Sequence, residues 1–206
     1  MASSIKKSDV FEKILKDSIG MKFKANSKEA NEWFAKKAKS IGRIKNEESF
    51  VKSLSSRMTS SIEIGKMVMF LYDAKTKEEL PYFDKFPLIF PIEKYSDGYL
   101  GLNFHYLPPK LRAILLDWLW PLANSKDINE KTKLKISYAI LGKLARHPYV
   151  EPCIKRYLYS HVRSSFIPVD APEWSIAIHL PTEKFTVRKT TVFKQTKKQL
   201  GINRKR

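Results

Sequence analysis

The residues that decide the fold of this chain are 88–107, which read LIFPIEKYSDGYLGLNFHYL. Two apolar, β-rich runs flank the turn sequence Ser-Asp-Gly at 96–98. An Asp-Gly pair is typical of hairpin turns, because it supplies the positive φ that such turns need. A third β-rich run, KMVMFLY at 66–72, precedes these two. The pattern predicts a three-stranded antiparallel meander over residues 65–107.

Prolines mark the limits of this sheet. Pro87 and Pro91 border and interrupt the run 88–93. Proline cannot donate a ladder hydrogen bond, so we expect that strand near a sheet edge. Pro108 and Pro109 end the last strand of the meander. Pro109 is also well placed to begin a helix, because its missing N–H would have no partner in a first helical turn.

Apolar residues at helical spacing follow the sheet. They predict helices over 110–122, 129–144 and 151–164, and the sequences after them predict closing strands at 166–169 and 174–180. The first of these helices would bury one apolar face, formed by Leu111, Ile114, Leu115, Trp118 and Leu119.

Two helices are expected before the sheet. Residues 1–26 contain a short amphipathic helix that stops near Gly20, followed by a loop. Residues 27–45 form a second helix with Ser27 as its cap. The apolar face of this second helix consists of Ala30, Trp33, Phe34, Ala38 and Ile41.

The coarse order is therefore helices, three strands, helices, strands and a basic end. Because strands and helices are segregated, the predicted fold class is α+β with a small antiparallel sheet. An SH3-like barrel interrupted by a helical insertion would fit this order. We expect a helical basic N-terminal segment at 1–64, an α+β core domain at 65–185 and a basic, flexible tail at 186–206.

The chain is strongly basic. Its 206 residues carry 39 Lys and Arg against 21 Asp and Glu, a formal net charge of +18, and the pI is 9.8. This exceeds the magnitude of roughly 2–8 that a small domain needs for solubility, and it indicates a polyanionic partner such as nucleic acid. Charge alone does not separate DNA from RNA, or either from an anionic membrane surface. No apolar run is long enough to span a bilayer, and residues 1–17 lack the apolar core of a signal peptide.

The basic residues fall into two groups. Residues 181–206 hold nine basic residues and one acidic residue, and another group lies on and after the predicted helix 27–45. On that helix the lysines would project opposite the apolar face, although a solvated lysine face that binds nothing is the alternative. The candidate nucleic-acid-binding residues are Lys28, Lys36, Lys39, Arg43, Lys45, Arg57, Arg188, Lys189, Lys194, Lys197, Lys198, Arg204, Lys205 and Arg206.

The sequence contains no pattern typical of catalysis. It lacks a Gly-x-Ser-x-Gly elbow, a Gly-x-x-x-x-Gly-Lys phosphate loop and a Gly-x-Gly-x-x-Gly dinucleotide motif. The four histidines show no metal-ligand spacing, and the only cysteine, Cys153, indicates a reducing compartment. We therefore expect a protein that is not an enzyme, with no catalytic residues, no metal and no cofactor. A metal-dependent nuclease would need converging carboxylates, for which the candidates are Asp73, Asp84, Glu93 and Asp97.

Aromatic residues are concentrated in the segment 81–112. Rings on an exposed sheet face could stack on unpaired bases, but rings at strand spacing usually belong to the core. A base-stacking face would need basic neighbours, for which Lys85, Lys94 and Arg112 are candidates. The rings are those of Tyr82, Phe83, Phe86, Phe90, Tyr95, Tyr99, Phe104 and Tyr106.

Several of these strings resemble one protein family. PYFDKFPLIFPI at 81–92, GYLGLNFHYLPPKLR at 98–112, SHVRS at 160–164 and the segment from Trp174 to Pro-Thr-Glu at 181–183 are similar to the DNA end protector family of T-even-type contractile-tailed phages. The resemblance covers most of residues 27–185. It implies a virion protein that binds the end of the packaged double-stranded genome, shields it from host exonucleases and helps to complete the head before tail joining.

The same resemblance implies the partners and the location. The partners would be double-stranded DNA and phage head, neck or tail proteins, with neither a membrane nor a small-molecule substrate. The protein would reside in the virion, and in the host cytoplasm during assembly. Two alternatives remain open: a structural adaptor of the neck, tail or baseplate without a DNA-specific role, and an RNA-binding or ribosome-associated protein.

Overall fold

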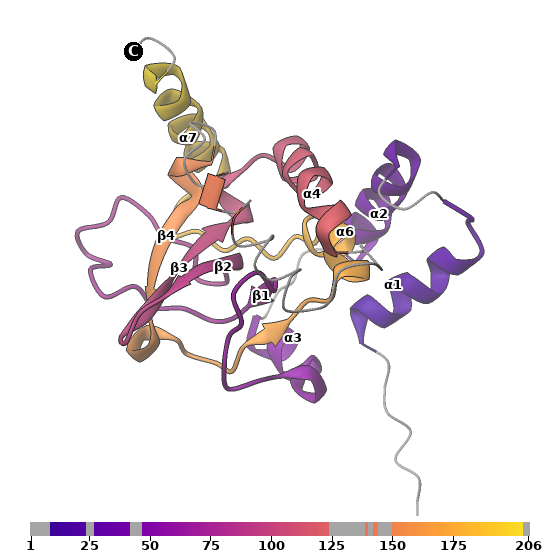
Figure 1. Ribbon diagram of the computed structural model, residues 1–206, viewed down its shortest axis with the longest axis horizontal. Helices are drawn as coiled ribbons and strands as arrows, with labels where there is room; N and C mark the ends of the chain where they lie inside the picture. The colour runs from indigo at the N-terminus through magenta and orange to yellow at the C-terminus, as the bar shows by residue number, and fades with distance from the viewer. Residues whose placement is uncertain are drawn as a thin grey trace, which may run out of the picture.

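The computed structural model describes residues 9–23, 27–41, 47–123, 139, 142–143 and 150–203. They form an α+β fold, as predicted, in which helices pack around a five-stranded antiparallel sheet (Figure 1). The strand order is β4-β3-β2-β1-β5. The strands are β1 (Val68–Met69), β2 (Leu88–Lys94), β3 (Gly98–Asn103), β4 (Ile154–Leu158) and β5 (Ile167–Pro168).

The predicted meander is confirmed, because β1, β2 and β3 are consecutive antiparallel neighbours. The N–H of Tyr95 donates to the carbonyl oxygen of Gly98 at 2.8 Å and closes the turn. Gly98 does not adopt the positive φ that the Asp-Gly pair predicted. A Cβ at this position would instead collide with the carbonyl oxygen of Tyr157, so glycine is needed here for the close approach of β4 to β3.

Strand β2 lies inside the sheet, between β1 and β3, so the edge position predicted from its prolines is wrong. Pro87 precedes the strand, and the register with β3 shifts between Pro91 and Glu93. Such an irregularity leaves backbone groups outside the ladder, which accommodates a residue without an N–H. The carbonyl of Pro91 still accepts a hydrogen bond from Gly65 N–H at 2.9 Å.

Two later elements have the opposite type from that predicted. Part of the predicted helix 151–164 is strand β4, which pairs with β3, because long-range pairing outweighs local periodicity. Part of the predicted strand 174–180 is the short helix α6 (Trp174–Ala177). All four residues of α6 are buried. Alternation of apolar and polar residues identifies a strand only when one side is exposed, so it is not informative for this element.

The sheet is open, so the predicted SH3-like barrel is wrong. Strands β4 and β5 form its two edges, and the segment expected to complete a barrel, 174–180, is not a strand. The predicted closing strand 166–169 is present as the two-residue β5, which pairs with β1.

The first two helices follow the predicted pattern, and the third helix before the sheet, α3 (Glu47–Ser53), was not predicted. The cap of α1 (Val10–Ile19) is Asp9, and that of α2 (Lys28–Ser40) is Ser27, whose side chain accepts from the N–H of Ala30 at 3.2 Å. Helix α2 thus confirms the first part of the predicted helix 27–45. The later helices are α4 (Pro109–Ala123) and α7 (Lys189–Asn203), and the predicted helix 129–144 lies almost entirely outside the described residues.

Helix α4 begins at Pro109, as predicted, but its buried side differs from the predicted one. Leu115 and Leu119 are buried, whereas Ile114 is 46% exposed. Arg112 occupies the interior instead, at 1% exposure. This arginine belongs to a polar cluster described below.

The two faces of the sheet belong to two apolar clusters. Along β2, Leu88 and Phe90 point to the cluster that includes α1, α2, α4 and α6, whereas Ile89 points to the other, as period-two alternation requires. The second cluster centres on Phe70, which contacts the rings of Tyr99 and of other aromatic residues. Most rings of segment 81–112 are therefore core, namely Phe83, Phe86, Phe90, Tyr99, Phe104 and Tyr106.

The segment predicted as a flexible tail contains helix α7. Val192 and Thr196, one helical turn apart, are 0% and 2% exposed. The Thr196 hydroxyl donates to the carbonyl oxygen of Tyr106 at 3.3 Å. These contacts hold α7 against the short 3₁₀ helix η2 (Phe104–Tyr106), and the rest of α7 projects from the body of the protein (Figure 1).

Candidate nucleic-acid interface

Helix α7 presents lysines on the side opposite its buried side. Lys194, Lys197 and Lys198 occupy positions i, i+3 and i+4, which place them on one helical face. All three are exposed, and none forms an ion pair within the described part of the chain. The face opposite holds Val192 and Thr196, which pack inward. Helix α7 therefore offers a fixed, unneutralised row of cations.

The first turn of α7 and the residue before it carry the next two candidates. Arg188 is exposed. Lys189 is also exposed, but its Nζ lies 3.3 Å from Glu183 Oε1, so its charge is partly engaged inside the protein. Of this group, the lysine face of α7, formed by Lys194, Lys197 and Lys198, is the part most available to a ligand.

Helix α2 presents a weaker version of the same arrangement. Lys28, Lys36 and Lys39 are exposed on the side away from the buried Phe34 and Ala38, as predicted. Lys28 lies 4.0 Å from Glu32 on this same side. Lys36 and Lys39 form no ion pair within the described residues, so two free cations remain on α2.

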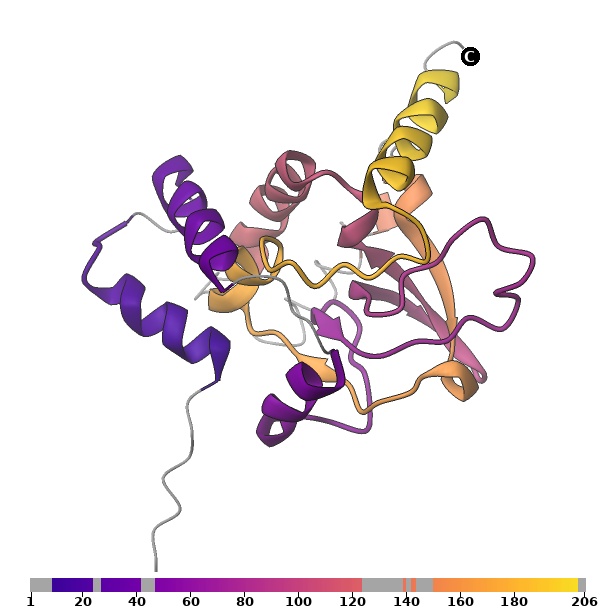
Figure 2. The same ribbon diagram turned by 180° about the vertical axis from the view of Figure 1, so that it is seen from behind.

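The two lysine-bearing helices are far apart on the molecule. Helix α2 packs against α6, whereas α7 packs against η2. They lie on opposite sides of the protein, with α4 between them, in both views (Figure 1, Figure 2). The sequence-predicted residues therefore form two separate surfaces rather than one.

Arg57 is a structural residue in this arrangement. Its guanidinium makes two 2.6 Å hydrogen bonds to the carboxylate of Glu173 and lies 3.1 Å from Asp9. The pKa of Arg57 is raised, because these two carboxylates more than offset the cost of its partial burial. Its charge joins α1 to the core and is already neutralised. Five other candidates, Arg43, Lys45, Arg204, Lys205 and Arg206, lie outside the described residues.

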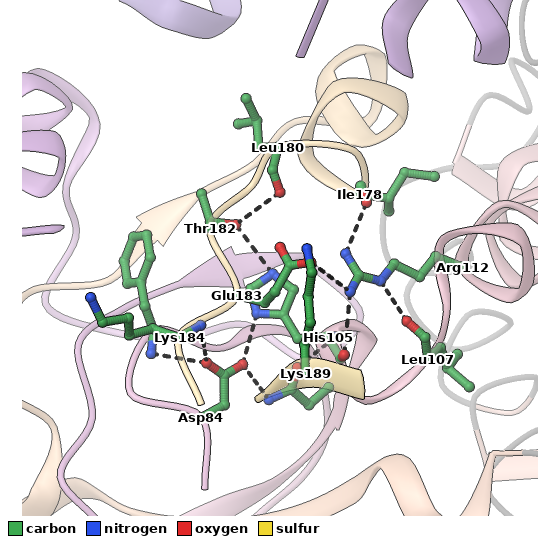
Figure 3. A network of polar contacts seen from close by, with 12 residues as sticks. Asp84, His105, Leu107, Arg112, Ile178, Leu180, Thr182, Glu183, Lys184 and Lys189 are labelled. Atoms are coloured by element: carbon green, nitrogen blue, oxygen red, sulfur yellow. Dashed lines mark hydrogen bonds and ion pairs between the residues drawn. The ribbon is translucent and has the colours of Figure 1, made fainter. Parts of the chain in front are cut away.

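A buried polar cluster is centred on Asp84 (Figure 3). The carboxylate of Asp84 accepts hydrogen bonds from the backbone N–H groups of Phe86 and Lys184, at 3.1 and 3.2 Å. It also accepts from the side-chain amide of Asn103 at 3.1 Å, and it lies 2.7 Å from Nδ1 of His105. Both oxygens of this buried carboxylate thus have hydrogen-bond partners within the protein.

Arg112 forms the other half of this cluster (Figure 3). Its guanidinium donates to the carbonyl oxygens of Leu107, Ile178 and His105, at 2.8, 3.1 and 3.3 Å. The fourth contact is to Glu183 Oε1 at 3.5 Å. Burial lowers the pKa of Arg112, and the Glu183 carboxylate opposes this effect. Arg112 thereby joins α4, η2 and the segment that leads from α6 to α7.

Glu183 is held as a carboxylate by its surroundings. Burial alone would raise its pKa, but the Arg112 guanidinium, with smaller effects from His105 and Lys189, lowers the pKa of Glu183 to about 2. The side chain is 8% exposed. Asp84, Arg112 and Glu183 are therefore charges that hold the fold together, and they are not available to a ligand.

Asp84, His105 and Thr182 line up in the order acid, imidazole and hydroxyl. His105 Nε2 lies 3.2 Å from the Thr182 hydroxyl oxygen, on the far side of the ring from Asp84. The three residues are 2%, 0% and 3% exposed, and a substrate bond could not reach the hydroxyl. Burial also raises the pKa of Cys153 to about 12, so this thiol is not a nucleophile at neutral pH.

The carboxylates considered for a nuclease do not converge. Asp84 is buried in the polar cluster, while Asp73 and Asp97 form exposed ion pairs with basic side chains. Glu93 is exposed on β2. Within the ranges that the structure describes, no three His, Cys, Asp or Glu residues are grouped to hold a metal ion.

A cleft of about 360 Å³ lies between β4 and the segment 72–84. Sequence reasoning missed it. Its cations are Lys75, Lys155 and Arg156, the last two of which fell on the wrongly predicted helix 151–164. A strand at 154–158 would have placed Lys155 and Tyr157 on one face, but the remaining lining comes from distant segments.

None of the helices in the described part of the chain has the length and apolar character needed to cross a membrane. A family model described as the phage T4 terminal DNA protecting protein matches residues 3–199. No match was found among curated proteins or among solved structures. The matched family is one of non-enzymatic proteins that protect the end of the phage genome and are associated with packaged DNA in the virion. Since the match spans nearly all of its residues, the chain belongs to the family of the phage T4 terminal DNA protecting protein.

Proposed function

We propose that this chain binds the terminal duplex of the genome chiefly through the lysine face of α7, with the exposed lysines of α2 as a second contact. The observation that carries the proposal is the position of Lys194, Lys197 and Lys198, which are exposed on one face of a helix anchored by its opposite side. Each lysine that meets a phosphate displaces condensed counterions from DNA, and this release drives the binding.

Binding of this kind does not depend on base sequence, because contacts to phosphates carry no base information. That property suits a protein that must cover whatever sequence stands at the end of a packaged genome. A protein bound over the end would protect it sterically, without any chemical step. The buried positions of Asp84, His105 and Thr182 support a role without catalysis.

The proposal also includes binding to proteins of the phage head, neck or tail. Ile19 and Met21, at the end of α1 and just after it, are 78% and 45% exposed. Helix α1 lies on the side of the molecule that carries α2, away from α7 (Figure 1). An assembly partner could bind there while α7 holds DNA, which would let the protein help to complete the head before tail joining. During assembly the protein would be in the host cytoplasm.

The test is digestion of a linear duplex by an exonuclease in the presence of the protein. The proposal expects protection of the duplex, and it expects a closed circle of the same sequence to compete poorly. Protection should weaken steeply as salt rises from about 50 to 200 mM, as counterion release requires. Equal competition by the circle would remove the preference for ends, and binding that is insensitive to salt would remove the phosphate mechanism.

A further inference from the structure

The cleft beside β4 combines cations with aromatic rings. Lys155 lies on β4 with its Nζ 4.5 Å from the centre of the Tyr106 ring. Tyr82, half-buried, stacks at a tilt against Tyr106, with ring centres 5.9 Å apart. Lys75 and Leu80 also line the cleft, and because both are exposed they belong to its rim. The lining therefore combines two contacting rings with two lysines.

Lys155 is held in this cleft without a carboxylate. It forms no ion pair among the residues that the structure describes. Burial lowers its pKa, which reflects the cost of keeping an ammonium group away from water. Its ring contact with Tyr106 offsets part of that cost. A bound anion would offset more, because a charge-assisted hydrogen bond is stronger than a cation–π contact.

The cleft contains one carboxylate, that of Asp84, and it is already satisfied. Asp84 is 2% exposed, and its oxygens are engaged by backbone N–H groups, Asn103 and His105. Arg156, at the rim, is paired with Asp97 and lies with its guanidinium 3.8 Å from the Tyr95 ring centre. The net unneutralised charge facing the cleft is therefore positive and comes from Lys75 and Lys155.

We propose that this cleft binds the terminal nucleotide of a DNA strand, with its phosphate at Lys155 and its base against Tyr82 and the rim residue Leu80. The inference rests on the proposed function, since it assumes DNA as the ligand. The volume of about 360 Å³ falls in the range of about 300–1,000 Å³ typical of small-ligand sites. It suits one nucleotide and excludes a base-paired duplex.

A cleft that admits a single nucleotide distinguishes an end from the interior of a duplex. An internal nucleotide must be unpaired and unstacked on both sides to enter it, at a cost of a few kcal/mol. A terminal nucleotide is stacked on one side only. The cleft also lies near α7, because Thr196, on the buried side of that helix, bonds to the carbonyl oxygen of Tyr106, whose ring lines the cleft. The duplex could thus lie along α7 while its last nucleotide occupies the cleft.

The experiment uses the full chain and short duplexes that carry one 2-aminopurine, a fluorescent base analogue, placed at the 5′-terminal, the 3′-terminal or a central position. We expect binding to change the fluorescence of a terminal probe and not of the central one, and the strand that responds identifies the polarity of the bound end. Lys155→Met should remove the terminal response and reduce affinity for the open duplex about tenfold relative to a hairpin-closed one.

Lys52→Met is the matched control, because Lys52 is an exposed lysine on α3 that does not line the cleft. It removes the same charge and should leave the terminal response intact. If Lys155→Met does not fold, Leu80→Asp replaces it, since Leu80 is 41% exposed and the new charge repels phosphate at the mouth. Identical terminal responses in the wild type and in the folded cleft variant would overturn the inference. Failure of the wild type to bind the open duplex at all would instead contradict the proposed function.

Discussion

Arg112 and the lysines on the outer face of α7 carry the same charge and have opposite roles. Arg112 is 1% exposed, and its guanidinium donates hydrogen bonds to three backbone carbonyls and to Glu183. Lys194, Lys197 and Lys198 are exposed and have no internal partner in the described structure. In a chain of net charge +18, the number of basic residues thus says little about which of them bind DNA. Burial and existing partners decide it.

Removing the Arg112 guanidinium should have the largest effect. Arg112→Met leaves three carbonyl oxygens buried without their donor and removes the buried cation beside Glu183, which keeps only Lys189 as an ion-pair partner among the described residues. Breaking a buried ion pair by removing one partner costs about 3–5 kcal/mol. We expect the free energy of unfolding to fall by that amount, as measured by urea denaturation. A variant that unfolds at the wild-type urea midpoint would show that the buried cluster does not stabilise the fold.

Neutralising the α7 face should affect DNA binding and leave stability unchanged. In Lys194→Gln/Lys197→Gln/Lys198→Gln, we expect affinity for linear duplex to fall roughly hundredfold. The plot of log K against log salt should become shallower by about 2.7, or about 0.9 for each lost phosphate contact. Filter binding or fluorescence anisotropy at several salt concentrations measures both quantities.

The matched control for the triple variant is Lys13→Gln/Lys16→Gln/Lys52→Gln. These lysines are exposed on α1 and α3, two helices that lie away from α7 (Figure 1). The control loses the same formal charge, so it separates a local contact from the general positive field. An equal loss of affinity in both variants would mean that α7 is no more than part of a diffuse basic surface.

Glu183, the buried partner of Arg112, should make the stability of the fold depend on pH. The folded-state pKa of Glu183 is about 2, below its ordinary value of 4.5. A carboxyl group with a lowered pKa stabilises the fold above the ordinary value, and the stabilisation disappears as pH falls from about 4.5 through 2. At about 1.4 kcal/mol per pKa unit, the contribution is on the order of 3 kcal/mol.

Glu183→Gln should therefore be less stable than the wild type at pH 7, by about 2 kcal/mol. The difference should shrink as the pH falls towards 2, because the wild type then loses the same charge. Urea denaturation at a series of pH values measures it. Parallel stability curves for the two proteins across this range would show that the ion pair with Arg112 does not set the acid sensitivity.

The part of the fold that the sequence predicted is the part with local signals. The meander over residues 65–107 has strands that neighbour one another along the chain, and Ser27 caps α2 through a bond to Ala30 only three residues away. Strand β4 was missed because Ile154, Tyr157, Leu158 and His161 satisfy helical spacing, and only pairing with β3, more than fifty residues earlier, makes them extended.

The candidate site divides in the same way. The spacing of Lys194, Lys197 and Lys198 is visible in the sequence, although the segment was expected to be a flexible tail. The structural role of Arg57 was not visible, because its partners, Asp9 and Glu173, lie far from it along the chain. The cleft at Lys155 was also invisible, since its walls come from three separate segments.

The smallest expected effect concerns the lysines of α2. Lys36→Gln/Lys39→Gln removes the two unpaired cations of that helix, on the side of the molecule away from α7. A duplex end held by α7 meets α2 only if the DNA bends or a second molecule binds, so we expect a loss of severalfold or less and a salt slope lower by less than about 1.8. Fluorescence anisotropy titrations of linear duplex with this variant and with the α7 triple variant compare the two losses of affinity. A loss as large as that of the α7 variant would mean that DNA spans both surfaces, and the lysines of α2 would then be a principal DNA contact rather than a minor one.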